Sequence, residues 1–329
     1  MLYLTKSPGF PALSACHTGG SLGPVINPTT IVVVGAAGKL GRLLILSLLA
    51  RPGVRVRALV RDPAKVERAG LPDDRVEWVA FDATTPDADA RAAAVRGAFA
   101  VISALQGGPD IIIDAQLNLL RAAKAAGARR FIASAYSYDL FGLPEGVNIN
   151  TDWRRTLAER ARAEVSDRFE VVHVMQGIFA DAAVLGFLGV FDAAAGVVRY
   201  WGDGTTPIDW TTWEDTARFT AAAALDERPV PERLYVRGDR LDVLAFARTL
   251  EATLGKPVTR ERLGSLEELA QETERRLAAE PNNMYAWLPL MYARGVFGGQ
   301  ALLGPPENAR YPEIHPETVA QAAARGALQ

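Results

Sequence analysis

Short apolar runs recur along the first half of the chain and alternate with segments of helical character. These runs cover residues 30–35, 54–61, 76–81, 98–103, 130–134 and 169–175. The first run is apolar on both faces, which is typical of a buried parallel strand. Helices are expected between the runs, and two of them end before the breakers Pro52 and Gly127. Strands that alternate with helices predict an α/β fold with a doubly wound parallel sheet.

After residue 176 the pattern loosens. A strand is expected at residues 234–238, and helices are expected at residues 243–254, 265–279 and 283–298. Ser265 with Glu268, and Thr211 with Glu214, have the spacing of a capping box at the start of a helix. We therefore expect residues 29–180 to form the sheet domain. Residues 181–329 are expected to form mostly a small C-terminal α+β lobe, with some segments returning to the sheet domain.

The composition is that of an ordinary folded protein. Among 329 residues, 49% are hydrophobic and 22% are charged, which excludes a disordered chain. The formal net charge is −2, so no basic field is available to hold a nucleic-acid backbone. Cys16 is the single cysteine and cannot form an internal disulfide or a thiolate metal cluster. Nucleic acid is therefore not expected as a partner.

The first 28 residues are expected to form a loose N-terminal extension, to which we assign no function. Prolines and glycines interrupt its apolar stretches, so it lacks the apolar core of a signal peptide. Elsewhere no apolar run approaches the roughly 18 residues needed to cross a bilayer. We expect a cytoplasmic protein that makes no membrane contact and is a monomer or a homodimer.

Three glycines stand between the first predicted strand and the helix after it, at Gly35, Gly38 and Gly41. The first permits a tight turn, the second lets backbone N–H groups approach a pyrophosphate, and the third lets the helix pack closely. The helix N-terminus adds partial positive charge. This loop predicts a dinucleotide site, and a plain turn with close helix packing is the alternative. The cofactor-binding residues expected here are Gly35, Ala37, Gly38, Lys39, Leu40 and Gly41.

The spacing Gly-x-x-Gly-x-x-Gly is the form found in extended and atypical short-chain dehydrogenases, and other segments sharpen this resemblance. They are GAAGKLGR at 35–42, VRALVRDP at 56–63, VISALQGG at 101–108, residues 202–218, and NARYPEIHPET at 308–318. Together they resemble the NmrA-like and isoflavone-reductase-like family over about residues 30–320. The resemblance implies an NAD(P)-binding Rossmann domain and a small substrate lobe. Family members include NADPH-dependent reductases and regulatory proteins that bind the cofactor without converting a substrate.

The end of the second predicted strand indicates which nicotinamide cofactor binds. NAD sites carry a carboxylate there, whereas this chain carries Arg61, whose guanidinium suits a 2′-phosphate. Lys39 and Lys65 are expected to add positive charge to this site. A solvent-exposed strand-end charge beside Asp62 is the alternative role for Arg61. We therefore expect NADP(H) to be preferred over NAD(H).

Further cofactor contacts are expected where the later strands end, because doubly wound sheets bind ligands at that edge. Asp82 follows the third strand, where its carboxylate can meet the adenine amino group or begin the next turn. The family resemblance implies cofactor contacts after the fourth and sixth strands as well. Beyond Asp82, the residues concerned are Ala104, Leu105, Gln106, Ser134, Ala135, Asn150, Gly177 and Ile178.

A reductase needs a proton donor near the oxygen on which negative charge develops. Neither Tyr136 nor Tyr138 has the lysine four residues later that short-chain dehydrogenases use. The family resemblance implies a lysine in the helix after the fifth strand instead, and Asn150 occupies about that place. Tyr136, at the end of that strand, is therefore the candidate catalytic residue. A ring that only lines the pocket wall is the alternative.

Two functions fit these observations. The first is an NADPH-dependent reductase of a small carbonyl or enol substrate, aromatic ones included, with Tyr136 or water as the proton source. The second is a non-catalytic NADP(H)-binding redox sensor that acts through a protein partner, and the missing lysine favours it. The histidines are scattered at positions 17, 173 and 315, so no metal site is expected.

Overall fold

The structure is a computed structural model, and it describes residues 28–66, 71 and 74–329. The expected N-terminal extension at residues 1–28 lies outside the described residues except for Pro28, and Cys16 lies outside them as well. Within the described part of the chain, no helix combines the length and the apolar character that a bilayer-spanning segment requires.

The described residues form a parallel sheet of seven strands at the centre of the molecule. The strands are β1 (Thr29–Val34), β2 (Val54–Val60), β3 (Val76–Ala80), β4 (Ala100–Ser103), β5 (Arg130–Ala133), β6 (Glu170–Met175) and β11 (Arg233–Tyr235). Their order is β11-β6-β5-β4-β1-β2-β3, and every pairing is parallel. The winding reverses between β1 and β4, which places the ligand crevice of such a sheet at their carboxyl ends. The predicted doubly wound α/β fold is confirmed.

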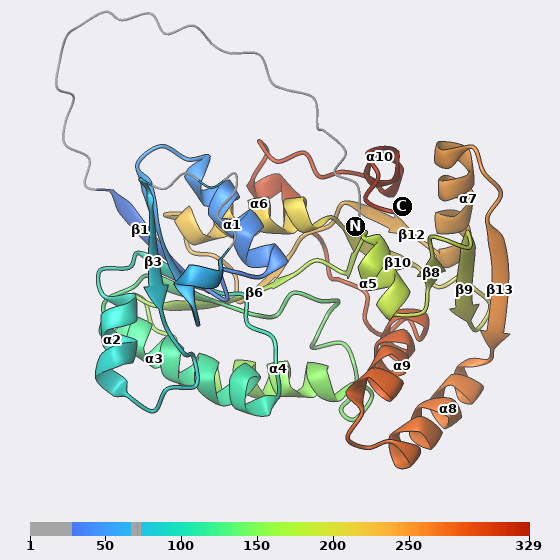
Figure 1. Cartoon of the computed structure of the whole chain (residues 1–329), viewed down its shortest axis with the longest axis horizontal. Helices are drawn as coiled ribbons and strands as arrows, with labels where there is room; N and C mark the ends of the chain where they lie inside the picture. Colours follow the sequence, from blue (N-terminus) through green and yellow to red (C-terminus); the bar gives the residue numbers. More distant parts are fainter. Residues whose placement is uncertain (1–27, 67–70, 72–73) are drawn as a thin grey trace, which may run out of the picture.

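Helices cover both faces of this sheet (Figure 1). One face carries α1 (Lys39–Leu49) and α6 (Trp213–Leu225), and the other carries α2 (Ala88–Val95), α3 (Gln116–Ala125) and α4 (Ile149–Ala161). Side chains alternate between these faces along β1. Ile31 and Val33 belong to the core with α1 and α6, whereas Val32 and Val34 belong to the core with α2, α3 and α4. Burial on both faces explains why β1 is a continuous apolar run.

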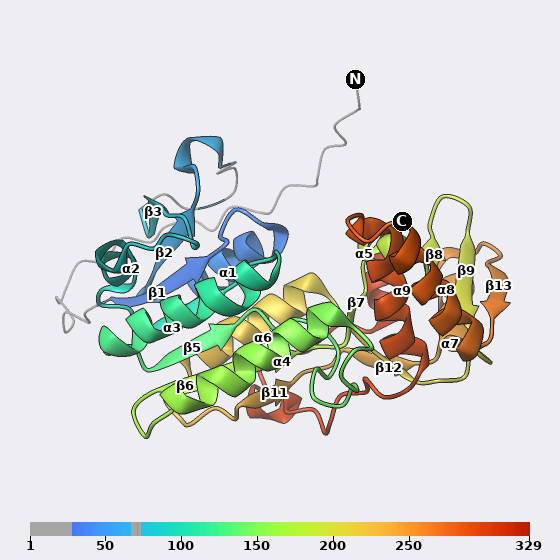
Figure 2. The same ribbon diagram turned by 90° about the horizontal axis from the view of Figure 1, so that it is seen from below.

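The C-terminal lobe lies beside this sheet domain (Figure 2). Its helices are α5 (Ala182–Phe187), α7 (Val243–Leu254), α8 (Leu266–Ala279), α9 (Met284–Phe297) and α10 (Val319–Ala324). Its small sheets contain β7 (Ile178–Phe179), β8 (Phe191–Asp192), β9 (Val197–Trp201), β10 (Ile208–Thr211), β12 (Asp239–Leu241) and β13 (Thr259–Gly264). The lobe has its own core, in which the rings of Trp210 and Phe246 stack with centroids 4.6 Å apart. Two later elements return to the sheet domain, because α6 packs on α1 and β11 pairs with β6.

Several predicted helices are confirmed closely. α7 covers the expected residues and ends at Gly255, which has a left-handed φ of 64°. Ser265 and Glu268 form the predicted capping box of α8. The helix expected to end before Gly127 is present, but it begins with a π-helical stretch, Asp110–Ala115, before α3.

The capping box expected from Thr211 and Glu214 is wrong by one residue. Thr211 ends β10, and its hydroxyl donates a hydrogen bond of 2.7 Å to the Gln176 carbonyl oxygen. The helix starts after Thr212, whose hydroxyl oxygen accepts from the Asp215 backbone N–H at 3.0 Å. Two adjacent threonines are followed three residues later by two adjacent acids, so the spacing alone does not fix which pair caps α6.

Candidate functional site

The glycine loop turns so tightly from β1 into α1 that two of its glycines have no room for a side chain. Gly35 has φ 76°, and a Cβ there would lie 2.7 Å from the Ala104 carbonyl oxygen. A Cβ on Gly41 would collide with the Gly35 carbonyl oxygen. At Gly38 the nearest atom is that same oxygen at 3.4 Å, so this side of the loop is open. Packing therefore requires the first and third glycines, while the second faces space that a ligand can enter.

The N-terminus of α1 is available to an anion. Gly38 is the N-cap, and among the described residues no side chain caps this turn and no acidic residue stands in it. The free N–H groups and the positive end of the helix dipole are therefore not neutralised locally. Ala37 and Lys39 are exposed, whereas the Leu40 side chain is buried and can offer only its backbone. These residues fit a pyrophosphate group.

The charged residues beyond β2 and β3 differ in their partners. Arg61 is exposed, and no described residue forms a hydrogen bond or ion pair with it. The backbone N–H and hydroxyl of Thr84 donate to Asp82 and lower the pKa of this carboxyl, with a smaller contribution from Arg61. Lys65 instead pairs with Asp62 at 3.2 Å. Arg61 is thus available to a 2′-phosphate, whereas Lys65 already has a partner.

Lys39 ties the glycine loop to the C-terminal lobe. Its Nζ lies 2.5 Å from an oxygen of Asp181, the N-cap residue of α5. The same nitrogen lies 5.3 Å from the centre of the Trp213 ring. Trp213 stacks on Phe179 with centroids 3.5 Å apart. The lysine expected to contact the cofactor therefore bridges the two sides of the crevice.

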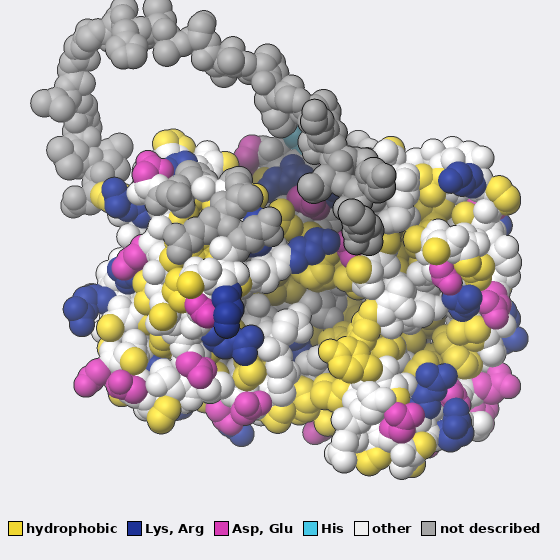
Figure 3. Space-filling view, viewed as in Figure 1, with side chains coloured by type: hydrophobic (Ala, Val, Ile, Leu, Met, Phe, Trp, Pro, Cys, Tyr) yellow, Lys and Arg dark blue, Asp and Glu magenta, His cyan; other side chains and the backbone are white. Residues whose placement is uncertain are grey.

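A cavity of about 200 Å³ lies where the strand ends meet the C-terminal lobe. Figure 3 shows hydrophobic side chains gathered along the hollow between these two parts of the molecule. The cavity brings together five residues singled out from the sequence, namely Gln106, Tyr136, Asn150, Gly177 and Ile178. Helices α5 and α9 and the residue after α5 add six further lining residues, which no sequence motif marks. These are Val184, Phe187, Leu188, Leu288, Tyr292 and Val296.

The predicted residues after β4 and β5 are joined to each other. The Ser134 hydroxyl donates to the Leu105 carbonyl oxygen at 2.7 Å, and the Ser134 backbone N–H donates to the Gln116 side chain at 2.9 Å. The Ala135 side chain is buried in a small core with Met175. This segment can therefore meet a cofactor mainly through its backbone.

Asn150 stands in the first turn of α4, one turn before Arg154. Arg154 is only 5% exposed. It donates to the Ser134 carbonyl oxygen at 3.0 Å, to the Asn150 carbonyl oxygen at 2.9 Å, and to the Asn150 side-chain Oδ1. All three acceptors are neutral oxygens, and no described carboxylate forms an ion pair with this guanidinium.

The Tyr136 ring lines the cavity, but its hydroxyl does not open into it. The hydroxyl oxygen is buried and forms no hydrogen bond of good geometry with a described residue, although the Thr220 side chain lies near enough to lower the pKa of the phenol by a smaller amount than burial raises it. The ring packs against the core with α1 and α6, and burial raises the pKa of the phenol above its usual value. This geometry agrees with the pocket-wall alternative, and the role of Tyr136 as proton donor stays a prediction.

Tyr138 also lines the cavity, although the sequence analysis tested it only for a lysine partner. Its hydroxyl oxygen accepts hydrogen bonds from Asn148 Nδ2 at 2.7 Å and from the Thr151 hydroxyl at 3.3 Å. Burial raises the pKa of this phenol. Asn148 is the N-cap of α4, and this contact can be recognised only once the helix is placed.

His173 belongs to the protein core. It is 1% exposed, and its ring lies edge-on to Phe141 with centroids 5.9 Å apart. Burial lowers the pKa of His173 to about 4, so the ring is neutral at physiological pH. Among the described residues, no group of three or more histidine, cysteine or acidic side chains is placed to hold a metal ion.

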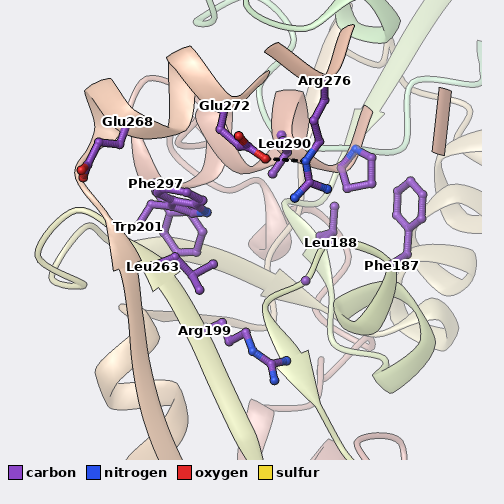
Figure 4. A pocket seen from close by; sticks show the side chains of 12 residues that line it. Phe187, Leu188, Arg199, Trp201, Leu263, Glu268, Glu272, Arg276, Leu290 and Phe297 are labelled. Atoms are coloured by element: carbon purple, nitrogen blue, oxygen red, sulfur yellow. Dashed lines mark hydrogen bonds and ion pairs between the residues drawn. The ribbon is translucent and has the colours of Figure 1, made fainter. Parts of the chain in front are cut away.

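A larger groove of about 550 Å³ adjoins the cavity and shares Phe187 and Leu188 with it. Figure 4 shows Trp201 beside Phe297 on one wall of this groove and Arg276 paired with Glu272 above it. Arg199, on the opposite side, pairs with Glu261 at 2.8 Å. Because its arginines already have acidic partners, the groove offers mainly apolar and aromatic surface.

Comparisons with known proteins agree with this geometry. Residues 35–167 match the family described as NAD(P)H-binding, and no curated protein matches the chain. AtPrR2 with NADP+ and (+)pinoresinol has 20% identity and a TM-score of 0.73, over 91% of this chain and 98% of that chain. Isoflavone reductase has 18% identity and a TM-score of 0.70, over 91% and 99%. Leucoanthocyanidin reductase with NADPH from Vitis vinifera has 19% identity and a TM-score of 0.73, over 91% and 100%.

Likeness at these identities concerns the fold, and together with the matched family it confirms the resemblance that the motifs indicate. The chain therefore carries an NAD(P)H-binding domain on a Rossmann-like fold, and its structural neighbours include isoflavone reductase and related reductases.

Proposed function

We propose that this protein is an NADPH-dependent reductase of a small carbonyl or enol substrate. The observation that carries this proposal is the cavity at the carboxyl ends of the strands, next to the glycine loop and closed by the C-terminal lobe. Residues 29–180 would hold the cofactor, and residues 181–329 would supply most of the substrate lobe. Two neighbours named as reductases, one of them solved with NADPH, and AtPrR2, which was solved with NADP+, support the same reaction class.

The residues present fit NADP(H). The open side of Gly38 and the uncapped start of α1 would hold the pyrophosphate, and Arg61 would hold the 2′-phosphate. When bound, the reduced nicotinamide supplies a hydride. Gly177 and Ile178 would form the wall next to the reacting carbon, and the apolar cavity would exclude water from it.

The cavity indicates what kind of substrate enters. Its volume of about 200 Å³ lies below the roughly 300–1,000 Å³ of most ligand pockets, so it suits a single ring or a short chain. Phe179 and Trp213 give it an aromatic wall. A longer substrate would continue past Phe187 into the adjoining groove.

The test combines binding and turnover on one preparation. Calorimetric titration with NADPH, NADP+, NADH and NAD+ should show tighter binding of the two phosphorylated forms. Consumption of NADPH should then be followed across a panel of small aromatic and aliphatic aldehydes, ketones and enones. Failure of all four nucleotides to bind would refute the proposal.

A second candidate is a non-catalytic NADP(H) sensor that acts through a protein partner. Asn150 in place of the family lysine favours it, as does the buried hydroxyl of Tyr136. A sensor must bind its two redox forms with different affinity, because only differential binding shifts an equilibrium. A difference of more than about tenfold between NADPH and NADP+, without turnover on the panel, would favour the sensor over the reductase.

A further inference from the structure

Arg154 fixes the orientation of the Asn150 carboxamide. A guanidinium has only donors, so the side-chain atom of Asn150 that it contacts must be the oxygen Oδ1. The Asn150 carbonyl accepts from the same guanidinium at 2.9 Å, so the arginine holds this residue at two points. The amide nitrogen Nδ2 therefore points away from Arg154.

The surroundings leave Nδ2 free to bind a ligand. The Asn150 backbone N–H is already bound to Asn148 Oδ1 at 2.9 Å. No described residue accepts a hydrogen bond from Nδ2. Asn150 is 7% exposed, and it lines the cavity. A hydrogen-bond donor with a fixed direction is thus presented in a nearly dry site.

Arg154 also makes this donor stronger. Its charge is buried beside the cavity, and its three acceptors are neutral oxygens. A cation bound to Oδ1 polarises the carboxamide and increases the positive charge on the N–H groups of Nδ2. No described residue that lines the cavity has an acidic side chain, so no carboxylate competes for this donor.

We propose that Asn150 Nδ2 binds the substrate oxygen on which negative charge develops, with Arg154 as its positioning residue. This proposal rests on the proposed reductase function. The carbonyl carbon gains a hydride, which NADPH supplies, and the electron pair of the carbon–oxygen π bond moves to the oxygen. That oxygen then takes a proton from water. Asn150 stabilises the oxyanion without transferring a proton, which is a different role from that of an acid or base at this position.

A phenolate tests this donor without knowledge of the substrate. Para-nitrophenol has a single ring, and its anion is coloured, so the bound protonation state can be read by absorbance. The wild-type protein should bind the phenolate more tightly than the phenol, which lowers the apparent pKa of the bound probe. Asn150→Ala should weaken phenolate binding by about 10- to 100-fold and leave phenol binding nearly unchanged. Asn150→Asp keeps the shape and pairs with Arg154, but it presents an acceptor to the cavity and should reverse the preference.

The arginine is tested in the same way, with a neighbour on α4 as control. Arg154→Lys, which keeps a donor and a charge, should retain most of the phenolate preference, and Arg154→Met should lose it. Arg155→Met is the matched control, because Arg155 lies on the same helix and already pairs with Asp152 and donates to the Leu143 carbonyl oxygen. If Arg154→Met does not fold, Asn150→Asp still tests the donor, and Arg154→Lys tests the arginine.

NADPH affinity, measured by calorimetry on each variant, separates the possible outcomes. We expect it to stay near the wild-type value in Asn150→Ala, because the donor serves the substrate side of the cavity. A parallel loss of NADPH affinity would assign Asn150 to the cofactor and overturn the inference. Absence of a phenolate preference in the wild type would overturn it as well. If the protein bound no nicotinamide nucleotide but still preferred phenolate in a manner that depends on Asn150, the role of Asn150 as an anion donor would be supported. Only the proposed reductase function would then be refuted.

Discussion

Arg61→Gln tests the choice between NADPH and NADH. The guanidinium is exposed and has no partner among the described residues, so its removal breaks no contact within them. A charge-assisted hydrogen bond contributes about 1.5–3 kcal/mol, and each 1.4 kcal/mol is about tenfold in affinity. We therefore expect NADPH to bind about 10- to 100-fold more weakly to the variant. NADH, which lacks the 2′-phosphate, should bind with unchanged affinity.

The assay is a calorimetric titration of the wild type and the variant with both nucleotides at low and at high salt. NADPH binding to the wild type should weaken with salt more than binding to the variant, because the lost contact is ionic. Lys65→Gln is the matched control. Lys65 already pairs with Asp62 at 3.2 Å, and exposed pairs contribute at most about 1 kcal/mol, so NADPH affinity should change by less than about fivefold. Equal losses for NADPH and NADH would refute the assignment of Arg61 to the 2′-phosphate.

Three further predictions concern stability and the candidate tyrosine. Gly41→Ala should lower the free energy of unfolding by about 1–3 kcal/mol, because its Cβ would collide with the Gly35 carbonyl. The control in urea unfolding is Gly186→Ala, whose Cβ would meet nothing closer than 3.8 Å. Equal unfolding midpoints for the two variants would contradict the packing argument. His173 stays neutral in the folded state between pH 6.5 and about 4 and takes up a proton only when the chain unfolds, so the free energy of unfolding should fall by up to about 3 kcal/mol over this range. His173→Leu should lose this part of the pH dependence. An unchanged slope of the unfolding free energy against pH would count against the assignment to His173. Tyr136→Phe should leave the melting temperature unchanged or raise it, because the removed hydroxyl is buried and forms no hydrogen bond of good geometry with a described residue. The turnover should also stay unchanged. A large loss of turnover would restore Tyr136 as the proton donor.

The glycine loop and the central sheet could be predicted because their signals are local. β1 is a run of valine and isoleucine because both of its faces are buried, and the three glycines follow it directly. The helical part of the cavity wall is different. Phe187 and Tyr292 come together on it although they are far apart in the sequence, and an apolar helix does not reveal which of its faces borders a cavity.

The role of the Asn150–Arg154 pair also could not be predicted from the sequence, because it depends on a contact with another element of the fold. From the sequence alone, Asn150 stands where the family resemblance implies a lysine, and its side chain is recognised only as unable to act as an acid. Arg154 also binds the carbonyl oxygen of Ser134, which lies on another element of the fold. That contact anchors the guanidinium, and the anchored guanidinium orients Asn150. Only the packed structure shows that an amide donor is held toward the cavity.

The missing lysine is a weak argument against catalysis once the magnitudes are compared. General acid–base catalysis typically contributes about 10²- to 10⁴-fold to a rate, whereas a single oxyanion donor contributes about 10²- to 10³-fold. An enzyme that uses an oxyanion donor in place of a general acid can therefore keep much of its rate, provided that water reaches the product oxygen. Arg154 keeps a positive charge one helical turn from Asn150, the position at which the family resemblance implies a lysine, and Asn150 Oδ1 couples this charge to the cavity. Turnover of NADPH on the substrate panel, together with the ratio of NADPH to NADP+ affinity, thus decides between reductase and sensor more sharply than the absence of a titrating lysine.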